Sequence, residues 1–457
     1  MAHSAGAEWW RPQLSGTTAP RGGASVPAQD SAVPFKALIV FTFILLLSPQ
    51  TFIPGLARAH IALLTGVLAV TAHCWSRFMT RQPMIRFTRE IWLAAALLGL
   101  AVVTIPMSEW PGGSVGVLLD VFLKALIIFW LLSNTVTTLR QLRTVAWSMT
   151  LMAAPLAMTA LRHFPSQHGA GRIVGYDAPL TQNPNDLALM LNLILPMVVA
   201  LFLVSRRPVV RGFLGGLIVL DASAIVVTFS RGGFLTLATI VVLYLRTLLK
   251  GRELKWAVAA LVLALAAVPL LPPGYLERLG TITNIQADET RSAQTRSRDM
   301  QAALTFTLSH PLTGAGLGMN ILALNEIRGP SWQPVHNVYL EYAVDLGWPG
   351  LGLFLLLLAS CIRSAARVRR RCGDLPALRE LSALAEAIRI TLVAFAVAAF
   401  FYPVAYHFYF YYFAALAVAA GAVYETEGQA ATGGLVRRSP RGEPLGPHLL
   451  PNMDRGT

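Results

Sequence analysis

The chain has 457 residues, of which 55% are hydrophobic and 13% are charged. Apolar runs recur along most of its length, which excludes a string of soluble domains and favours one membrane-embedded bundle. The formal net charge of +14 does not indicate a nucleic-acid partner, because the Lys and Arg residues cluster in short loops between apolar runs, as in membrane proteins.

About twelve segments are long and apolar enough to cross a membrane, and in lipid each must be a helix that satisfies its own backbone hydrogen bonds. In chain order they are residues 36–53, 56–74, 91–106, 115–133, 143–161, 186–204, 212–229, 232–249, 255–272, 338–362, 385–402 and 406–424. The sequence therefore predicts an all-α integral membrane protein with its bundle in residues 36–424. Residues 1–35 and 425–457, with their Gly and Pro and few apolar runs, are predicted to be disordered cytoplasmic tails.

The arginine-rich connections alternate with poorly charged ones. The basic connections are residues 75–90, 134–142, 205–211, 246–255 and 363–384. The positive-inside rule places these connections and both termini in the cytoplasm, so the other connections face outward. The longest outward connection, residues 273–337 between the ninth and tenth spans, is expected to form a small ordered cap.

A short outward turn carries an arginine between two predicted spans. Its sequence is Ser230-Arg231-Gly232-Gly233. Arginine is costly to place near lipid, so Arg231 is interpreted either as an anion-binding residue or as a side chain that snorkels to the membrane surface. The paired glycines allow a sharp turn and a close approach of the backbone to a ligand.

A histidine lies where the long outward loop meets the next span. His336-Asn337 is followed after nine residues by Gly347-Trp348-Pro349-Gly350. A neutral imidazole at this place is able to accept a proton from an attacking hydroxyl. The alternative is a polar residue at the membrane surface with no part in chemistry.

The outward loops also hold a cluster of cations. Arg291, Arg296 and Arg298 precede the run from His310 to Gly316, and Arg172 lies in an earlier outward connection. Positive charge is normally depleted on this side of a membrane, so the cluster indicates an anionic ligand. The alternative is a solvated face on which the arginines pair with neighbouring carboxylates.

Within the predicted spans, Asp120 and Lys124 lie four residues apart, which predicts a neutralising pair that faces the bundle interior. Lys124 is also a candidate ligand for an anionic head group. The outward segments contain neither an Asp-x-Asp or His/Cys cluster for a metal nor a phosphate-binding glycine loop for a nucleotide. We therefore expect no metal and no cofactor.

Taken together, these motifs resemble the bacterial O-antigen ligase and polymerase family. The resemblance rests on Ser230-Arg231-Gly232, on Arg298 ahead of His310-Pro311-x-x-Gly314-x-Gly316, and on the His336-Asn337 and Gly347-x-x-Gly350 pair. It implies a GT-C-like, metal-independent glycosyltransferase in the bacterial inner membrane, with its active site facing the periplasm. Such enzymes take a glycan from undecaprenyl diphosphate and pass it to a glycan or glycolipid acceptor.

The resemblance also implies roles for individual residues. Arg231 and Arg298 would bind the donor diphosphate, and His336 would be the general base on the acceptor hydroxyl. Substrate-binding roles are expected for Arg172, Arg291, Arg296, Asn337 and Lys124. Guanidinium groups suit this task because they bind phosphate oxygens through paired hydrogen bonds.

Several functions remain open at this point. O-antigen ligases, polysaccharide polymerases and protein O-oligosaccharyltransferases share these motifs. A transporter of lipid-linked sugars is the alternative from another class, and it would show internal repeats with binding residues near the membrane midplane. The sequence shows no convincing repeat, and its charged candidates gather at one side.

Overall fold

The computed structural model describes residues 32–163 except 52, 54, 55 and 57, residues 183–250, residues 292–437 except 374, and residues 256, 258, 275 and 280. Within this part of the chain all regular elements are helical. Ten segments are long and apolar enough to cross a membrane, which confirms a multi-pass all-α membrane protein. The expected span at 255–272 falls almost wholly outside the described residues, so the total number of spans stays a prediction.

The main helices follow the predicted spans in order. They are α1 (Ala32–Leu47), α2 (Ile61–Met79), α3 (Arg89–Thr104), α4 (Pro111–Val117), α5 (Leu123–Thr135), α6 (Leu139–His163), α7 (Pro184–Val204), α8 (Pro208–Val227), α9 (Arg231–Lys250), α12 (Ser292–Ser309), α13 (Asn320–Arg328), α14 (Val338–Cys372), α15 (Arg379–Ala398) and α16 (Phe408–Arg437). Short helical pieces η1 (Pro49–Thr51), η2 (Ile105–Met107), η3 (Leu118–Phe122) and η7 (Pro376–Leu378) adjoin them. The first helix, α1, is shorter than a full span.

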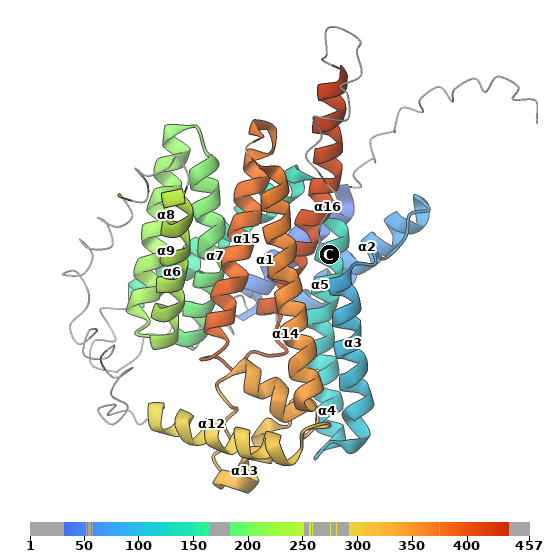
Figure 1. The fold of residues 1–457 in the computed structure, drawn as a ribbon, viewed down its shortest axis with the longest axis vertical. Coiled ribbons are helices and arrows are strands. Elements are labelled where there is room, and N and C mark those ends of the chain that lie inside the picture. The colour runs from blue at the N-terminus through green and yellow to red at the C-terminus, as the bar shows by residue number, and fades with distance from the viewer. Residues whose placement is uncertain are drawn as a thin grey trace, which may run out of the picture.

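Three helices, α7, α15 and α16, form the centre of the bundle (Figure 1). The sequence of α7 is apolar on every side, which is the pattern of a helix surrounded by other helices. It packs against α6, α8 and α15, while α15 also contacts α14 and α16 contacts α5. By contrast, α2 leans away at the edge and exposes Leu63, Leu64 and Trp75, as expected of a surface that faces lipid.

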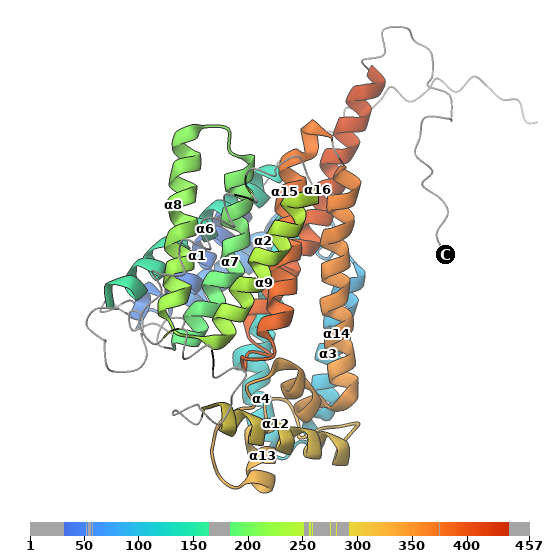
Figure 2. The same ribbon diagram turned by 60° about the vertical axis from the view of Figure 1, so that its left-hand side comes forward.

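The two ends of the bundle differ in what they carry. The turns from α7 to α8 and from α14 to α15, which contain two of the basic connections, lie at one end (Figure 2). Helices α12 and α13 lie at the opposite end, where α9 and α14 begin. The molecule thus separates its arginine-rich loops from the segments that hold the candidate site.

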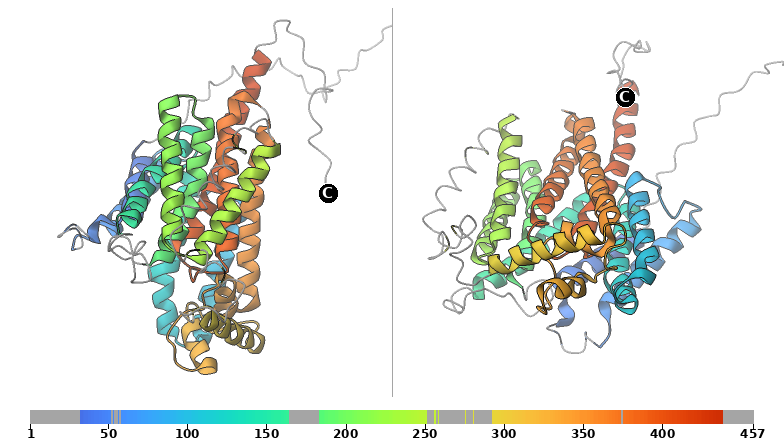
Figure 3. Two further views of the ribbon diagram at one scale, coloured as in Figure 1. Left: turned by 90° about the vertical axis from the view of Figure 1, so that its left-hand side faces the viewer. Right: turned by 60° about the horizontal axis from the view of Figure 1, so that its bottom comes forward.

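Helices α12 and α13 form a small layer, the cap, that lies across this end of the bundle (Figure 3). The cap has a core of its own, made by Ala302, Ala303 and Phe306 of α12 with Ala323 and Leu324 of α13. Apolar residues are spaced three and four apart in α12, so one face of this helix turns toward that core.

Two glycines join the cap to α14 through reciprocal close contacts. A Cβ on Gly314 would lie 2.5 Å from the carbonyl oxygen of Val344, and a Cβ on Gly347 would lie 2.6 Å from that of Pro311. Both glycines have a φ of +65°, a conformation that other residues rarely adopt. Backbone hydrogen bonds complete the joint, including one of 2.8 Å from the Trp348 N–H to the Pro311 carbonyl. The glycine motifs of the sequence therefore have a structural task, which is to dock the cap on α14.

Candidate functional site

The turn between α8 and α9 presents Arg231 at the cap end of the bundle. The Ser230 side chain caps α9, because its Oγ accepts a hydrogen bond of 3.1 Å from the Gly233 N–H. The two glycines of this turn allow close packing: a Cβ on Gly232 would lie 2.8 Å from Cβ of Phe401, and one on Gly233 would lie 2.8 Å from Cβ of Ala188. Their small size brings α9 against α7 and against the turn that follows α15.

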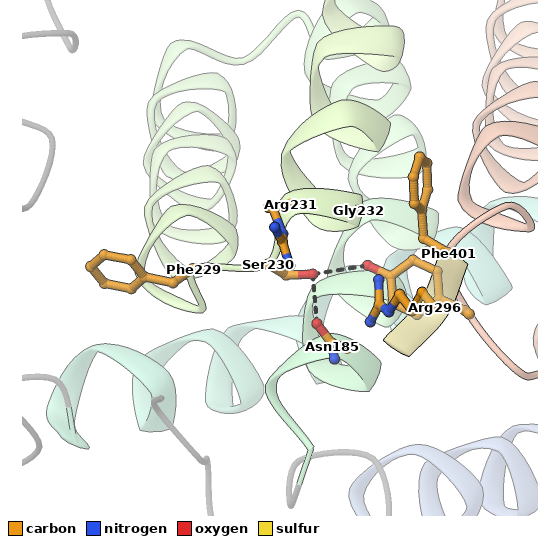
Figure 4. Close-up of a pocket in the computed structure, with 8 residues that line it drawn as sticks. Asn185, Phe229, Ser230, Arg231, Gly232, Arg296 and Phe401 are labelled. Carbon is orange, nitrogen blue, oxygen red and sulfur yellow. Dashed lines mark hydrogen bonds between the residues drawn. The ribbon is translucent and has the colours of Figure 1, made fainter. Parts of the chain in front are cut away.

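A small open pocket lies beside this turn (Figure 4). Its lining comes from segments that are far apart in the chain, namely Asn185, Phe229, Ser230, Arg231, Gly232, Arg296, Phe401 and Tyr402. Arg231 at the start of α9 and Arg296 in the first half of α12 are the charged residues among them. The pocket therefore combines two guanidinium groups with hydroxyl and amide groups, which is a composition suited to an anion.

A hydrogen-bond network forms one wall of the pocket. The Ser230 hydroxyl donates to Oδ1 of Asn185 at 2.8 Å, and the Tyr402 hydroxyl lies 3.3 Å from the Ser230 Oγ (Figure 4). Burial raises the pKa of Tyr402, so its hydroxyl keeps its proton and donates to Ser230. The wall is therefore held in one arrangement from α7, the α8–α9 turn and the segment after α15.

The α12 arginines point to different places. Arg296 lines the pocket with Arg231, whereas the exposed Arg298 donates a hydrogen bond to the Arg328 carbonyl. Two residues along a helix correspond to a turn of roughly 200°, so side chains at these positions leave opposite sides of α12. The structure thus brings Arg296, and not Arg298, beside Arg231.

His336 precedes α14 and lies outside the pocket lining. Its Nδ1 is 3.1 Å from the Pro334 carbonyl oxygen, which assigns the proton of the neutral ring to Nδ1 and makes Nε2 the basic nitrogen. The backbone next to His336 contacts the segment that carries Tyr402. The Val338 N–H donates a hydrogen bond of 2.8 Å to the carbonyl of Ala399, which is three residues before Tyr402. His336 is half-buried at the same end of the bundle as the pocket.

The side chain of Asn337 has a different partner from the one expected. Its Oδ1 accepts a hydrogen bond of 3.1 Å from the Leu340 N–H and so caps α14. This amide therefore helps to start the helix that follows His336, and its expected role in substrate binding stays a prediction.

The prediction that Asp120 and Lys124 face the bundle interior is wrong. The pair itself is present, with Nζ of Lys124 3.2 Å from Oδ1 of Asp120, but the side chains are 58% and 77% exposed. A spacing of four residues makes two side chains neighbours on a helix. It does not determine whether that side of the helix faces the bundle or its surroundings. Lys124 does not line the pocket.

The remaining candidates cannot be placed beside the pocket. Arg172 and Arg291 lie outside the described residues. Within the described ranges, no group of three or more His, Cys, Asp or Glu side chains is arranged to hold a metal ion.

The sequence interpretation missed Phe401 and Tyr402, because it placed residue 402 inside a span. In the structure α15 ends at Ala398, and the aromatic pair falls in the turn that precedes α16. The run Phe400-Phe401-Tyr402-Pro403 is the signal for this earlier end, since the residue before a proline is disfavoured in a helix.

Comparison with known proteins identifies one region of the chain. Residues 216–355 match a family model described as O-Antigen ligase. The matched region contains the α8–α9 turn, the cap and the first half of α14, and so includes Arg231, Arg296 and His336. A search of curated proteins finds no match to the chain.

Proposed function

We propose that this chain, a multi-pass membrane protein of the O-antigen ligase and polymerase family, transfers a glycan from undecaprenyl diphosphate to an acceptor hydroxyl on the periplasmic side of the bacterial inner membrane. The family consists of glycosyltransferase-like enzymes that act on lipid-linked glycans. The observation that carries the proposal is the convergence of Arg231 and Arg296 in one polar pocket, at the end of the bundle opposite the basic loops.

The arginine pair suits the leaving group of this reaction. When the bond between the anomeric carbon and the diphosphate oxygen breaks, negative charge grows on the diphosphate. Guanidinium groups already fixed in the pocket stabilise that charge without a rearrangement in the transition state. With this much positive charge in place, we propose that the transfer needs neither a divalent metal nor ATP.

His336 is the proposed base for the acceptor. The acceptor oxygen attacks the anomeric carbon, its proton passes to Nε2 of His336, and the carrier diphosphate leaves with the electron pair of the broken bond. The hydrogen bond from Nδ1 to the Pro334 carbonyl holds the ring in the tautomer that this step requires. The acceptor is a hydroxyl of a glycan or glycolipid; a ligase, a polymerase and a protein O-oligosaccharyltransferase would differ only in what presents that hydroxyl.

The transporter alternative has less support. The candidate cations gather at one end of the bundle, whereas a transporter binds its substrate near the midplane, often between broken helices. The described part of α9, which carries Arg231, is an unbroken helix from its first residue onward.

Reconstitution tests the proposal. The purified chain in proteoliposomes is supplied with an undecaprenyl diphosphate-linked glycan and candidate acceptors, in the presence of a chelator. We expect transfer, with a loss of about 100- to 1,000-fold in Arg231→Ala and Arg296→Ala and a loss of about 100-fold or more in His336→Ala. Arg298→Ala distinguishes the two α12 arginines, since the pocket geometry predicts a smaller loss for it than for Arg296→Ala.

Arg207→Ala is the matched control, because this exposed arginine lies in the α7–α8 turn at the other end of the bundle. Its transfer rate should equal that of the unaltered chain. Full activity in both Arg231→Ala and Arg296→Ala would contradict the proposed donor site. The product identifies the acceptor class: a capped glycolipid, a lengthened glycan or a modified protein.

A further inference from the structure

An apolar stripe runs along α12 on a side that does not face the cap core. Met300, Leu304 and Leu308 follow one another at intervals of four residues, and their exposed fractions are 40%, 49% and 71%. Residues four apart lie on the same face of a helix, so these side chains form one continuous strip about 12 Å long. The neighbouring exposed positions Gln301 and Thr305 are polar.

The stripe starts beside the pocket. Arg296 is four residues before Met300 and therefore lies on the same face of α12. Beyond the other end of the helix the exposed apolar surface continues with Leu312 and Trp348, which are 72% and 47% exposed. The strip thus leads from the candidate diphosphate site to the beginning of the membrane-spanning part of α14.

The position of α12 matches that of a helix at a membrane surface. It lies across the end of the bundle, at a steep angle to the spanning helices, so its long axis follows the membrane plane (Figures 1 and 3). Interfacial helices have this orientation, with an apolar side in the lipid and a polar side that often carries Lys or Arg. Here the exposed polar side contains Arg298, Thr305 and Ser309.

A neighbouring hairpin indicates the level that the lipid reaches at this end. The hairpin of α3 and α4 reaches to the level of α12 in both Figure 1 and Figure 2. Its exposed side chains include Val103 at 70%, Met107 at 62% and Trp110 at 60%. This hairpin belongs to two membrane spans, and it contacts the cap through a hydrogen bond of 2.8 Å from the Glu109 N–H to the Ala315 carbonyl.

We infer that α12 is an interfacial helix and that Met300, Leu304 and Leu308 insert into the outer leaflet of the membrane. Exposure of an apolar strip to water is unfavourable, and contact with the acyl chains at this level removes that cost. The partner is a lipid surface continuous with the one around α3 and α4. The consequence is that the pocket opens at the boundary between head groups and acyl chains, which is where the diphosphate of a lipid-linked molecule lies.

Spin-label accessibility tests this inference without any measurement of transfer, so its failure is separable from failure of the proposed enzyme activity. Nitroxide labels are attached to single cysteines at Met300, Leu304 and Leu308, with the exposed Thr305 and Ser309 as matched positions on the polar side. The full chain carries Cys74→Ser, which removes a partly exposed thiol. Cys361 and Cys372 are kept, because they are buried and do not compete for the label. The labelled protein is reconstituted in vesicles of phosphatidylethanolamine and phosphatidylglycerol.

Collision rates with oxygen, which concentrates in lipid, are compared with those of a water-soluble nickel chelate. We expect the oxygen-to-nickel ratio to be several-fold higher at the three stripe positions than at Thr305 and Ser309. Equal nickel access at stripe and polar positions would show that the stripe faces water. Low access to both reagents would show that protein covers it, either another segment of the chain or a second copy. Either result overturns the inference, and agreement among three independent sites guards against a local disturbance by one label.

Discussion

For single residues, the arrangement of the pocket depends on the side of α12 from which each arginine side chain projects. Arg296 and Arg298 are chemically equivalent and two positions apart, yet Arg296 lines the pocket and Arg298 binds the Arg328 carbonyl. The motif resemblance favoured Arg298 for the diphosphate. The helical rotation of α12 favours Arg296, because the neighbouring Asp299, Ala302 and Ala303 are buried and fix how that helix rests on the cap core.

The reciprocal glycines give a prediction at this scale. Gly347→Ala should lower the free energy of unfolding by about 1–3 kcal/mol, because alanine is strained at positive φ and its Cβ would collide with the Pro311 carbonyl. Gly314→Ala should act in the same way against Val344. Thermal unfolding in detergent measures both effects.

Gly352→Ala is the control for this prediction. Gly352 lies in the same helix, and a Cβ there would meet nothing within 4 Å. This variant should be neutral or slightly more stable, since alanine is the better helix former. An equal loss in Gly352→Ala and Gly347→Ala would show that the close contact between cap and α14 is unimportant.

At the scale of elements, a buried ion pair holds the cap together. Arg328, the last residue of α13, pairs with Asp299 of α12, and the side chains are 3% and 2% exposed. Arg328 also donates to the Gln333 carbonyl, three residues before His336. One guanidinium group therefore connects the helix that carries Arg296 to the segment that carries the proposed base.

Removal of the Arg328 guanidinium should lower the free energy of unfolding. Arg328→Ala leaves a buried carboxylate without its partner, for which a loss of about 3–5 kcal/mol is expected. In the double variant Asp299→Ala/Arg328→Ala the loss should be smaller than the sum of the two single losses, because no buried charge remains. Gln301→Ala, at an exposed position of α12, should be neutral. Thermal unfolding measures the whole series, and additive losses would contradict the ion pair.

The same ion pair predicts that the stability lost in Arg328→Ala depends on pH. Burial raises the pKa of Asp299 above its ordinary value of 3.8, and the charge of Arg328 opposes that rise. In Arg328→Ala the largest part of this opposition is lost, and only the more weakly acting Arg298 and Arg296 remain, so the pKa of Asp299 in the folded chain lies further above its value in the unfolded chain. The free energy of unfolding of Arg328→Ala is then highest below the pKa that Asp299 has in the unfolded chain. It falls as pH rises through the pKa that Asp299 has in the folded chain. The deficit of Arg328→Ala should therefore be small near pH 4 and grow toward neutral pH.

At the scale of the whole molecule, the proposal depends on the separation of two ends. The basic loops lie at one end of the bundle, and the pocket, the cap and His336 lie at the other. The positive-inside rule then predicts that the pocket lies outside the cytoplasm. A lipid-linked glycan that has already crossed the membrane would meet the site directly.

Labelling of single cysteines tests this orientation. In a Cys74→Ser background, Thr305→Cys on the cap should react with an impermeant maleimide in right-side-out membrane vesicles. Arg207→Cys in the α7–α8 turn should react only after the membrane is permeabilised. Both residues are exposed, so accessibility within the protein does not distinguish them. The reverse pattern would place the pocket in the cytoplasm and remove the basis for a periplasmic transferase.

The membrane bundle, the alternation of basic loops and the motifs of the less charged connections can all be predicted from the order of amino acids. These are local properties: a span needs an apolar length, an orientation needs arginines in short loops, and a motif needs a few neighbouring residues. Even the Asp120–Lys124 pair followed from spacing alone.

The contacts between distant residues could not be predicted in this way. The pocket joins Ser230 and Arg231 to Arg296 and to Tyr402, which lie on three segments separated by long stretches of chain. Their convergence is set by the packing of α9 on α7 and α15 and by the docking of the cap on α14. The exposure of Lys124 was decided in the same way. Periodicity within one helix carries no information on which neighbour that helix will face, so these relations follow from packing between distant segments.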